Sequence, residues 1–154
     1  MKRDSRLSGV LHVLLHLAEY DRPVTSEVLA GAVDTNPVVI RRILAGLREH
    51  GYVRSDKGHG GGWTLARDLT DVTLRDIYEA IGRPSLLAMA TREAAPRCLV
   101  EQAVNTALSA AFRDAEAALL ARLGEVTLGA LSVDFHDRLV ARRGRQHLEN
   151  VRAS

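Results

Sequence analysis

A glycine-rich stretch near the middle of the chain restricts what its surroundings can fold into. It reads KGHGGGWTLAR over residues 57–67, with four glycines among five consecutive residues. Glycine accepts backbone angles that other residues avoid, so this stretch predicts a tight and flexible loop. Residues 52–55 before the loop and 63–65 after it contain aromatic and β-branched residues, which favours two short strands. The sequence therefore predicts a β-hairpin with a basic, glycine-rich tip.

Three helices are predicted ahead of this hairpin. Apolar side chains recur at helical spacing over residues 7–18, which indicates a helix with one buried stripe. Two shorter helices, at about 26–33 and 37–50, are predicted to follow it. The residues that favour the starts and ends of these two helices are Thr25, Asn36, Pro37 and Gly51.

Two further helices are predicted after the hairpin. Residues 73–76 resemble a capping box that opens a helix whose inward side chains extend to Ile81. From Cys98 to about Leu123 the chain reads as one helix of about 39 Å, at ~1.5 Å per residue. This helix is longer than a small helical domain can cover, so its apolar stripe needs a second copy of the chain. We expect the dimer interface to consist of Leu108, Phe112, Ala115, Leu119 and Leu123.

Positive charge gathers on the part of the chain that would meet a nucleic acid. The formal net charge is only +2, yet residues 36–67 carry six Lys and Arg against two Asp and Glu. In a helix-turn-helix the second helix places its N-terminal residues at base edges, and a wing can reach the backbone or the minor groove. A solvated charged face is the alternative, but the glycine-rich hairpin favours DNA. The candidate DNA-binding residues are Thr35, Asn36, Val38, Arg41, Arg42, Lys57, His59, Gly60 and Gly61.

These elements together predict a mainly α protein. The expected fold is a winged helix-turn-helix with a two-stranded β-wing and a long C-terminal dimerisation helix. We expect a DNA-binding domain at 1–82, a connecting and sensing segment at 83–97, dimerisation helices at 98–135 and a basic tail at 136–154. A short helical turn is expected from Thr127 to about Leu131. The tail shows little periodicity, so we expect it to be loosely ordered, with arginines that are solvated or add phosphate contacts.

Composition disfavours several other classes of protein. No apolar run approaches the ~20 residues of a membrane helix, and the charged start argues against a signal peptide. The single cysteine excludes an intrachain disulfide and suits a reducing, cytoplasmic location. A phosphate-binding glycine loop lies between a strand and a helix, whereas a strand is expected here on both sides. No histidine adjoins Cys98 in sequence, so a thiol enzyme lacks support and we expect no enzymatic activity.

The order of these motifs resembles a known family. Three helices with NPVVIRRIL at residues 36–44, then GYV at 51–53 and GGWTLAR at 61–67, are similar to the Rrf-two family of bacterial transcription regulators. The resemblance covers about residues 1–131. It implies a homodimeric winged-helix repressor that binds double-stranded DNA at a palindromic promoter site and dimerises through the long helix.

The chain departs from this family at the cysteines. The best-known members hold an iron–sulfur cluster with three cysteines near the start of the long helix, whereas Cys98 is the only cysteine here. Cluster ligation needs several thiolates, so we expect no such cofactor. A helix N-terminus and the neighbouring Arg97 would stabilise the Cys98 thiolate, which suggests a redox sensor. The alternative is a small buried hydrophobic residue. Segment 82–98 is the candidate site for an oxidant or small-molecule effector.

Two other hypotheses are kept open. His12, His16 and Glu19 lie on one face of the first helix, at a spacing that could hold a metal with a further ligand, but a polar outer face is favoured and we expect no metal site. A winged helix can also serve as a protein-interaction adaptor without sequence-specific DNA binding. The basic charge and the glycine-rich wing disfavour that alternative.

Overall fold

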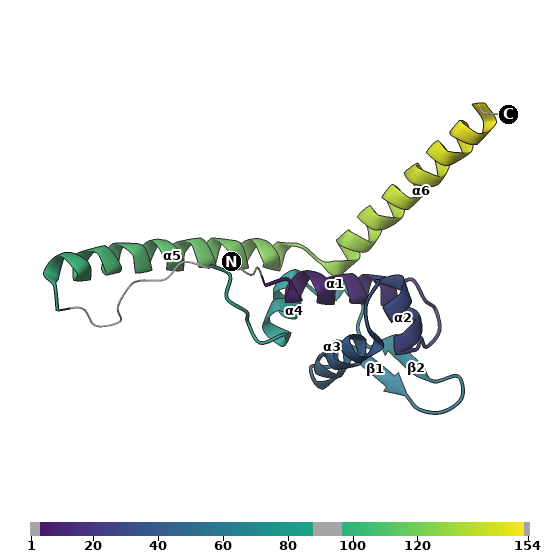
Figure 1. Ribbon diagram of the computed structural model, residues 1–154, viewed down its shortest axis with the longest axis horizontal. Helices are drawn as coiled ribbons and strands as arrows, with labels where there is room; N and C mark the ends of the chain where they lie inside the picture. Colours follow the sequence, from purple (N-terminus) through teal and green to yellow (C-terminus); the bar gives the residue numbers. More distant parts are fainter. Residues whose placement is uncertain (1–3, 88–96, 153–154) are drawn as a thin grey trace.

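Three helices, a hairpin and a fourth helix build one domain, from which two long helices extend (Figure 1). The computed structural model describes residues 4–87 and 97–152. The domain contains α1 (Arg6–Leu17), α2 (Ser26–Ala32), α3 (Pro37–Glu49), β1 (Val53–Asp56), β2 (Gly62–Leu65), the 3-10 turn η1 (Leu69–Asp71) and α4 (Leu74–Ala80). The long helices are α5 (Leu99–Glu125) and α6 (Leu128–Arg152). The mainly helical fold with a two-stranded sheet is the predicted one.

Side-chain caps fix the starts of the short helices where the sequence predicts them. The Thr25 side chain accepts a hydrogen bond from Val28 N at the start of α2. The Asn36 side chain accepts one from Val38 N at 2.7 Å, at the start of α3. Gly51 follows α3 with φ +73°, a conformation that glycine adopts at little cost. A capping box opens α4, formed by Thr73 and Asp76.

The hairpin is joined to the helices by backbone hydrogen bonds. Strands β1 and β2 are antiparallel and pair Val53 with Leu65 at one end. Trp63 also forms an isolated bridge with Val24, where Trp63 N donates to Val24 O at 2.8 Å and Val24 N donates to Trp63 O at 3.0 Å. The approach requires glycine beside it, because a Cβ on Gly62 would lie 2.6 Å from Val24 O. The wing is therefore held against the chain that leads into α2.

The hydrophobic core lies between α1, α2, α3 and α4. Its fully buried side chains include Leu14, Leu29, Ile40, Leu44 and Ile77. The junction of the long helices also enters this core, since Leu128 has no exposed surface. Leu128 N donates to Val72 O at 2.8 Å, so the start of α6 is fixed on the domain.

Helix α5 extends away from the domain for most of its length (Figure 1). It has 27 residues, and none of them is buried in this chain. At about 1.5 Å per residue the helix is roughly 40 Å long, as the sequence predicts. Five of its large apolar side chains are exposed: Leu99, Val100, Val104, Leu108 and Leu119.

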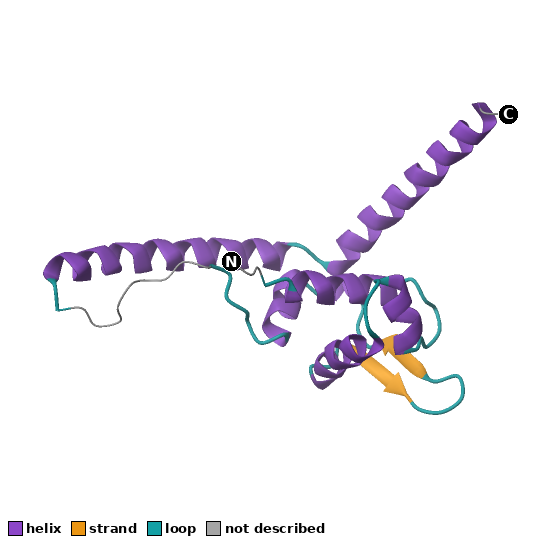
Figure 2. Cartoon of the chain, viewed as in Figure 1, coloured by secondary structure: helices purple, strands orange, loops and turns teal. Residues whose placement is uncertain are grey.

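Helix α6 corrects the prediction for the C-terminal part of the chain. We expected a turn ending near Leu131 and a loosely ordered tail at 136–154, but one helix continues to Arg152 (Figure 2). Thr127 does cap it, accepting from Ala130 N at 3.1 Å. The missed signal is an apolar series at helical spacing, formed by Leu128, Leu131, Phe135 and Leu139. An ion pair of 2.7 Å between Asp134 and Arg138, four residues apart, adds support.

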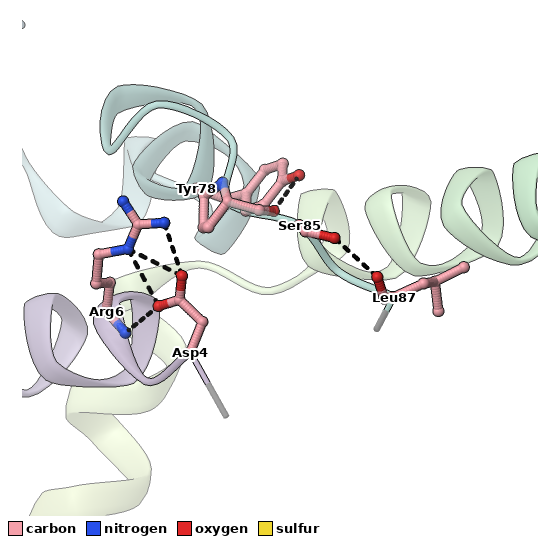
Figure 3. Close-up of polar contacts among 6 residues, drawn as sticks. Asp4, Arg6, Tyr78, Ser85 and Leu87 are labelled. Atoms are coloured by element: carbon pink, nitrogen blue, oxygen red, sulfur yellow. Dashed lines mark hydrogen bonds and ion pairs between the residues drawn. The ribbon is translucent and has the colours of Figure 1, made fainter. Parts of the chain in front are cut away.

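The first part of the predicted connecting segment is anchored to α4. The buried Tyr78 hydroxyl donates to Pro84 O at 2.9 Å, and Ser85 Oγ donates to Leu87 O at 2.8 Å (Figure 3). Residues 88–96, which make up most of the predicted segment 83–97, lie outside the described residues.

Candidate nucleic-acid interface

The turn between α2 and α3 sets the direction of the candidate recognition helix. Asp34 adopts φ +52°, and Thr35 N donates to Ala30 O at 2.9 Å. This tight turn leaves the N-terminal end of α3 at the surface. Val28 on α2 and Val38 on α3 are 49% and 55% exposed, which is unusual for valine in a core-forming pair of helices. Apolar side chains at such a place can contact a thymine methyl group.

The five candidate residues at the start of α3 are all exposed, but their side chains diverge. Arg41 forms an ion pair with Glu27 on α2. Arg42 instead lines a groove between α3, α1 and α4. Asn36 uses its carboxamide oxygen for the helix cap, so its amide NH2 group is what remains for a base or phosphate. Thr35 and Val38 complete the set, and both are exposed.

The wing carries the second candidate group. Lys57, His59 and Gly60 are exposed in the loop, while Gly61 is partly covered. A Cβ on Gly61 would lie 2.4 Å from Asp56 O, so the loop closes over a position that only glycine can fill. The loop borders a hollow of about 430 Å³ that Arg22 and Val28 also line. The tip of the wing and the exposed end of α2 therefore share one surface.

Arg48 connects the recognition helix to the wing, a role that the sequence analysis did not identify. Its guanidinium donates to Ser55 Oγ at 3.0 Å and lies 5.8 Å from the centroid of the Trp63 ring. Trp63 Nε1 in turn donates to Ser26 Oγ at 3.0 Å, and Ser26 is buried. Helices α2 and α3 and strand β2 are thus fixed to one another. The available signal was the spacing of Val38, Arg41, Ala45 and Arg48, which places them on one face of α3.

The geometry thus brings α3 and the hairpin to one end of the domain, as expected (Figure 2). Arg41 and the wing lie on the side of α2, and both are exposed. Arg42 instead lies on the side of α3 that faces α1 and α4.

Comparison with known proteins places the chain in a family. The sequence model of Rrf2, described as an iron-dependent transcriptional regulator, matches residues 3–134. YwnA of Bacillus subtilis, assigned as an HTH-type transcriptional regulator, is 30% identical over 125 residues, which cover 81% of this chain and 92% of the relative. The chain belongs to the Rrf2 family of transcriptional regulators. As a family member it is a DNA-binding transcriptional regulator and not an enzyme, and the adaptor alternative loses its support.

Solved structures share the fold of this Rrf2 regulator. A protein from Lactobacillus plantarum, assigned as a transcriptional regulator, has a TM-score of 0.72 with 27% identity and covers 93% of this chain and 97% of its own. IscR of T. potens has a TM-score of 0.62 with 20% identity, over 87% of this chain and 88% of its own. At that identity the second comparison concerns the fold alone.

The residues of this chain do not fit the iron that the family description names. Cys98 is the only cysteine in the whole sequence, and it is exposed at the N-cap position of α5. Within residues 4–87 and 97–152, no group of three or more His, Cys, Asp or Glu side chains is placed to hold a metal ion. A thiolate-bound cluster needs several sulfur ligands, and this chain supplies one.

The structure also locates the remaining candidate residues. The backbone N–H groups of Glu101 and Val100 at the start of α5 lower the pKa of the Cys98 thiol. On α1, His12 and His16 contact each other with their Nε2 atoms 3.1 Å apart. A carboxylate oxygen of Glu19, just after α1, lies 3.3 Å from His136 Nε2 on α6, so this end of α1 is partly covered. No helix in the described part of the chain is long and apolar enough to cross a membrane.

Proposed function

We propose that this Rrf2 regulator is a cytoplasmic homodimer that binds a palindromic promoter site in double-stranded DNA and represses transcription. The linkage from Arg48 through Trp63 to Ser26 carries the proposal, because it fixes α3 and the wing as one unit. In this arrangement the start of α3 contacts base edges or adjacent phosphates in the major groove, through Thr35, Asn36, Val38 and Arg41. Lys57 and His59 contact the neighbouring backbone or minor groove.

The proposed dimer forms through α5. A helix of 27 residues with no buried side chain gains little from its own chain, and its exposed leucines and valines favour an apolar partner. Sedimentation of Leu108→Glu/Leu119→Glu should give a folded monomer where the natural chain gives a dimer. Asp114→Lys changes an exposed charge on the opposite face of the same helix and should remain dimeric. A dimer that survives the double leucine substitution would contradict this interface.

DNA binding tests the proposed surface directly. Fluorescence anisotropy with a duplex from upstream of the gene should show an affinity that falls on the order of 10³-fold between ~50 and ~200 mM salt. Lys57→Ala and Arg41→Ala should each weaken binding, and Lys57→Ala should also reduce the salt dependence. Arg113→Ala removes an exposed arginine of α5 and serves as the control. If the control weakens binding as much as Lys57→Ala does, the surface is misplaced.

We also propose that oxidation of Cys98 changes the DNA affinity. The thiol is exposed and its lowered pKa increases the reactive thiolate fraction, so a sulfenic acid or an intersubunit disulfide can form there. Hydrogen peroxide should alter promoter binding of the natural chain and leave Cys98→Ser unchanged. An equal response of the two proteins would show that this cysteine is not the sensor.

A further inference from the structure

A groove separates α3 from α1 and α4, on the side of the recognition helix away from α2. Its volume of about 550 Å³ lies within the range of small-molecule sites. Apolar side chains form most of its surface, among them Val10, Val39, Ile43, Leu47, Ala80 and Ile81. Ser5, Arg6 and Arg42 are the polar residues that line it.

Two glycines keep this groove open. Gly9 lies in α1 and Gly46 in α3, and both line it. Glycine within a helix is destabilising relative to alanine, and neither residue has the positive φ that would require it. A Cβ at either position would meet no atom within 4 Å. The two glycines therefore leave unfilled space along the wall of the groove, which a molecule seated there would occupy.

The two arginines at the groove differ in the partners that the described residues give them. The Arg6 guanidinium is bound by the Asp4 carboxylate through several hydrogen bonds, the shortest of 2.6 Å (Figure 3). Arg42 is exposed, and within residues 4–87 and 97–152 its guanidinium has no ion pair or hydrogen bond. An apolar wall with one free guanidinium is complementary to a molecule with an apolar body and a single negative charge.

We propose that this groove binds a monocarboxylic acid with an apolar body, whose carboxylate pairs with Arg42 and lowers the affinity for DNA. The effect on DNA rests on the proposed function, because Arg42 lies next to Arg41 on the recognition helix α3. A carboxylate that forms hydrogen bonds with this guanidinium neutralises a positive charge on α3, so the attraction of this helix to DNA phosphates becomes weaker. Binding of the acid itself does not depend on DNA.

Calorimetry on the full chain with octanoate, in the absence of DNA, tests the groove alone. Octanoate should bind one site per chain, and octanol, which lacks the charge, should bind at least tenfold more weakly. Gly46→Leu fills the groove at a position with free space, so it should remain folded and lose octanoate binding. Gly31→Leu places the same side chain on α2, also in open space but outside the groove, and should bind as the natural chain does. Arg42→Gln should weaken octanoate at least tenfold and leave octanol unchanged.

Three results would overturn the proposal. They are octanoate binding retained in Gly46→Leu, equal affinity for octanoate and octanol, and a change of oligomeric state in Gly46→Leu, which would mean that a second copy fills the groove. Octanoate should also weaken DNA binding of the natural chain and not of Gly46→Leu. Failure of the natural chain to bind DNA at all would refute the proposed function and leave the calorimetric result standing.

Discussion

Replacing Gly62 with alanine should release the wing from the recognition unit. The new Cβ would lie 2.6–2.8 Å from the O, C and N atoms of Val24, and the residue has φ +149°. Relief of the clash breaks the two hydrogen bonds between Val24 and Trp63, worth about 0.5–1.5 kcal/mol each. The unusual backbone conformation adds about 1–2 kcal/mol. We therefore expect the free energy of unfolding to fall by roughly 2–5 kcal/mol, out of the ~5–15 kcal/mol of a typical domain.

Urea unfolding and the fluorescence of Trp63, the only tryptophan in the chain, measure this directly. Gly62→Ala should shift the native emission to longer wavelength as the indole loses contact with Ser26, and DNA affinity should fall on the order of tenfold. Gly58→Ala is the matched control, because it has φ +90° but open space around its Cβ position. It should lose about 1–2 kcal/mol, with unchanged emission. Equal losses in the two variants, or an unshifted spectrum in Gly62→Ala, would refute the reasoning.

Three further predictions concern α3, the turn before it and α1. Arg48→Ala should weaken DNA binding severalfold with little change in stability, because it removes an exposed contact between α3 and the wing. Fluorescence anisotropy measures the DNA affinity, and urea unfolding measures the stability. Asp34→Asn should keep the left-handed turn, since asparagine tolerates that conformation. Because the substitution removes a negative charge, DNA affinity at low salt should rise on the order of twofold. A gain in affinity that persists at high salt would argue against the electrostatic cause. Partial burial and the charge of His12 lower the pKa of His16, although Glu19 opposes this, so its neutral form is favoured in the folded state. The free energy of unfolding should therefore fall as the pH drops below the unfolded pKa of about 6.5. Urea titrations at pH 8 and at pH 5 should show a smaller difference in the free energy of unfolding for His16→Gln than for the natural chain.

Local sequence signals predicted the domain and its caps. Thr25, Asn36, Thr73 and Gly51 act through neighbours within a few residues, so their roles can be read from the sequence alone. Helix α5 could be predicted because its apolar residues recur at helical spacing over a long stretch without a proline. The full extent of α6 is hard to predict from the sequence, because the apolar series at helical spacing ends at Leu139 and mostly polar residues follow it.

The arrangement of the candidate site depended on contacts distant in sequence. The hydrogen bond between Trp63 and Ser26 joins residues 37 positions apart, and no periodic pattern in the sequence predicts it. The opposite directions of Arg41 and Arg42 follow from their places on α3 relative to α2 and α1, which are fixed only when the helices pack. Sequence patterns therefore identified the residue types of the interface, while packing decided which of them share a face.

A hydroxyl-radical footprint of the full chain on DNA upstream of its own gene tests the central claim most directly. Two recognition units in one dimer should protect two symmetric half-sites whose centres lie about 10–10.5 base pairs, or a multiple of that distance, apart. Each half-site should lose its wing-side protection in Lys57→Ala. A single unpaired patch, or paired half-sites whose protection is unchanged in Lys57→Ala, would contradict an interface built from α3 and the wing and presented twice.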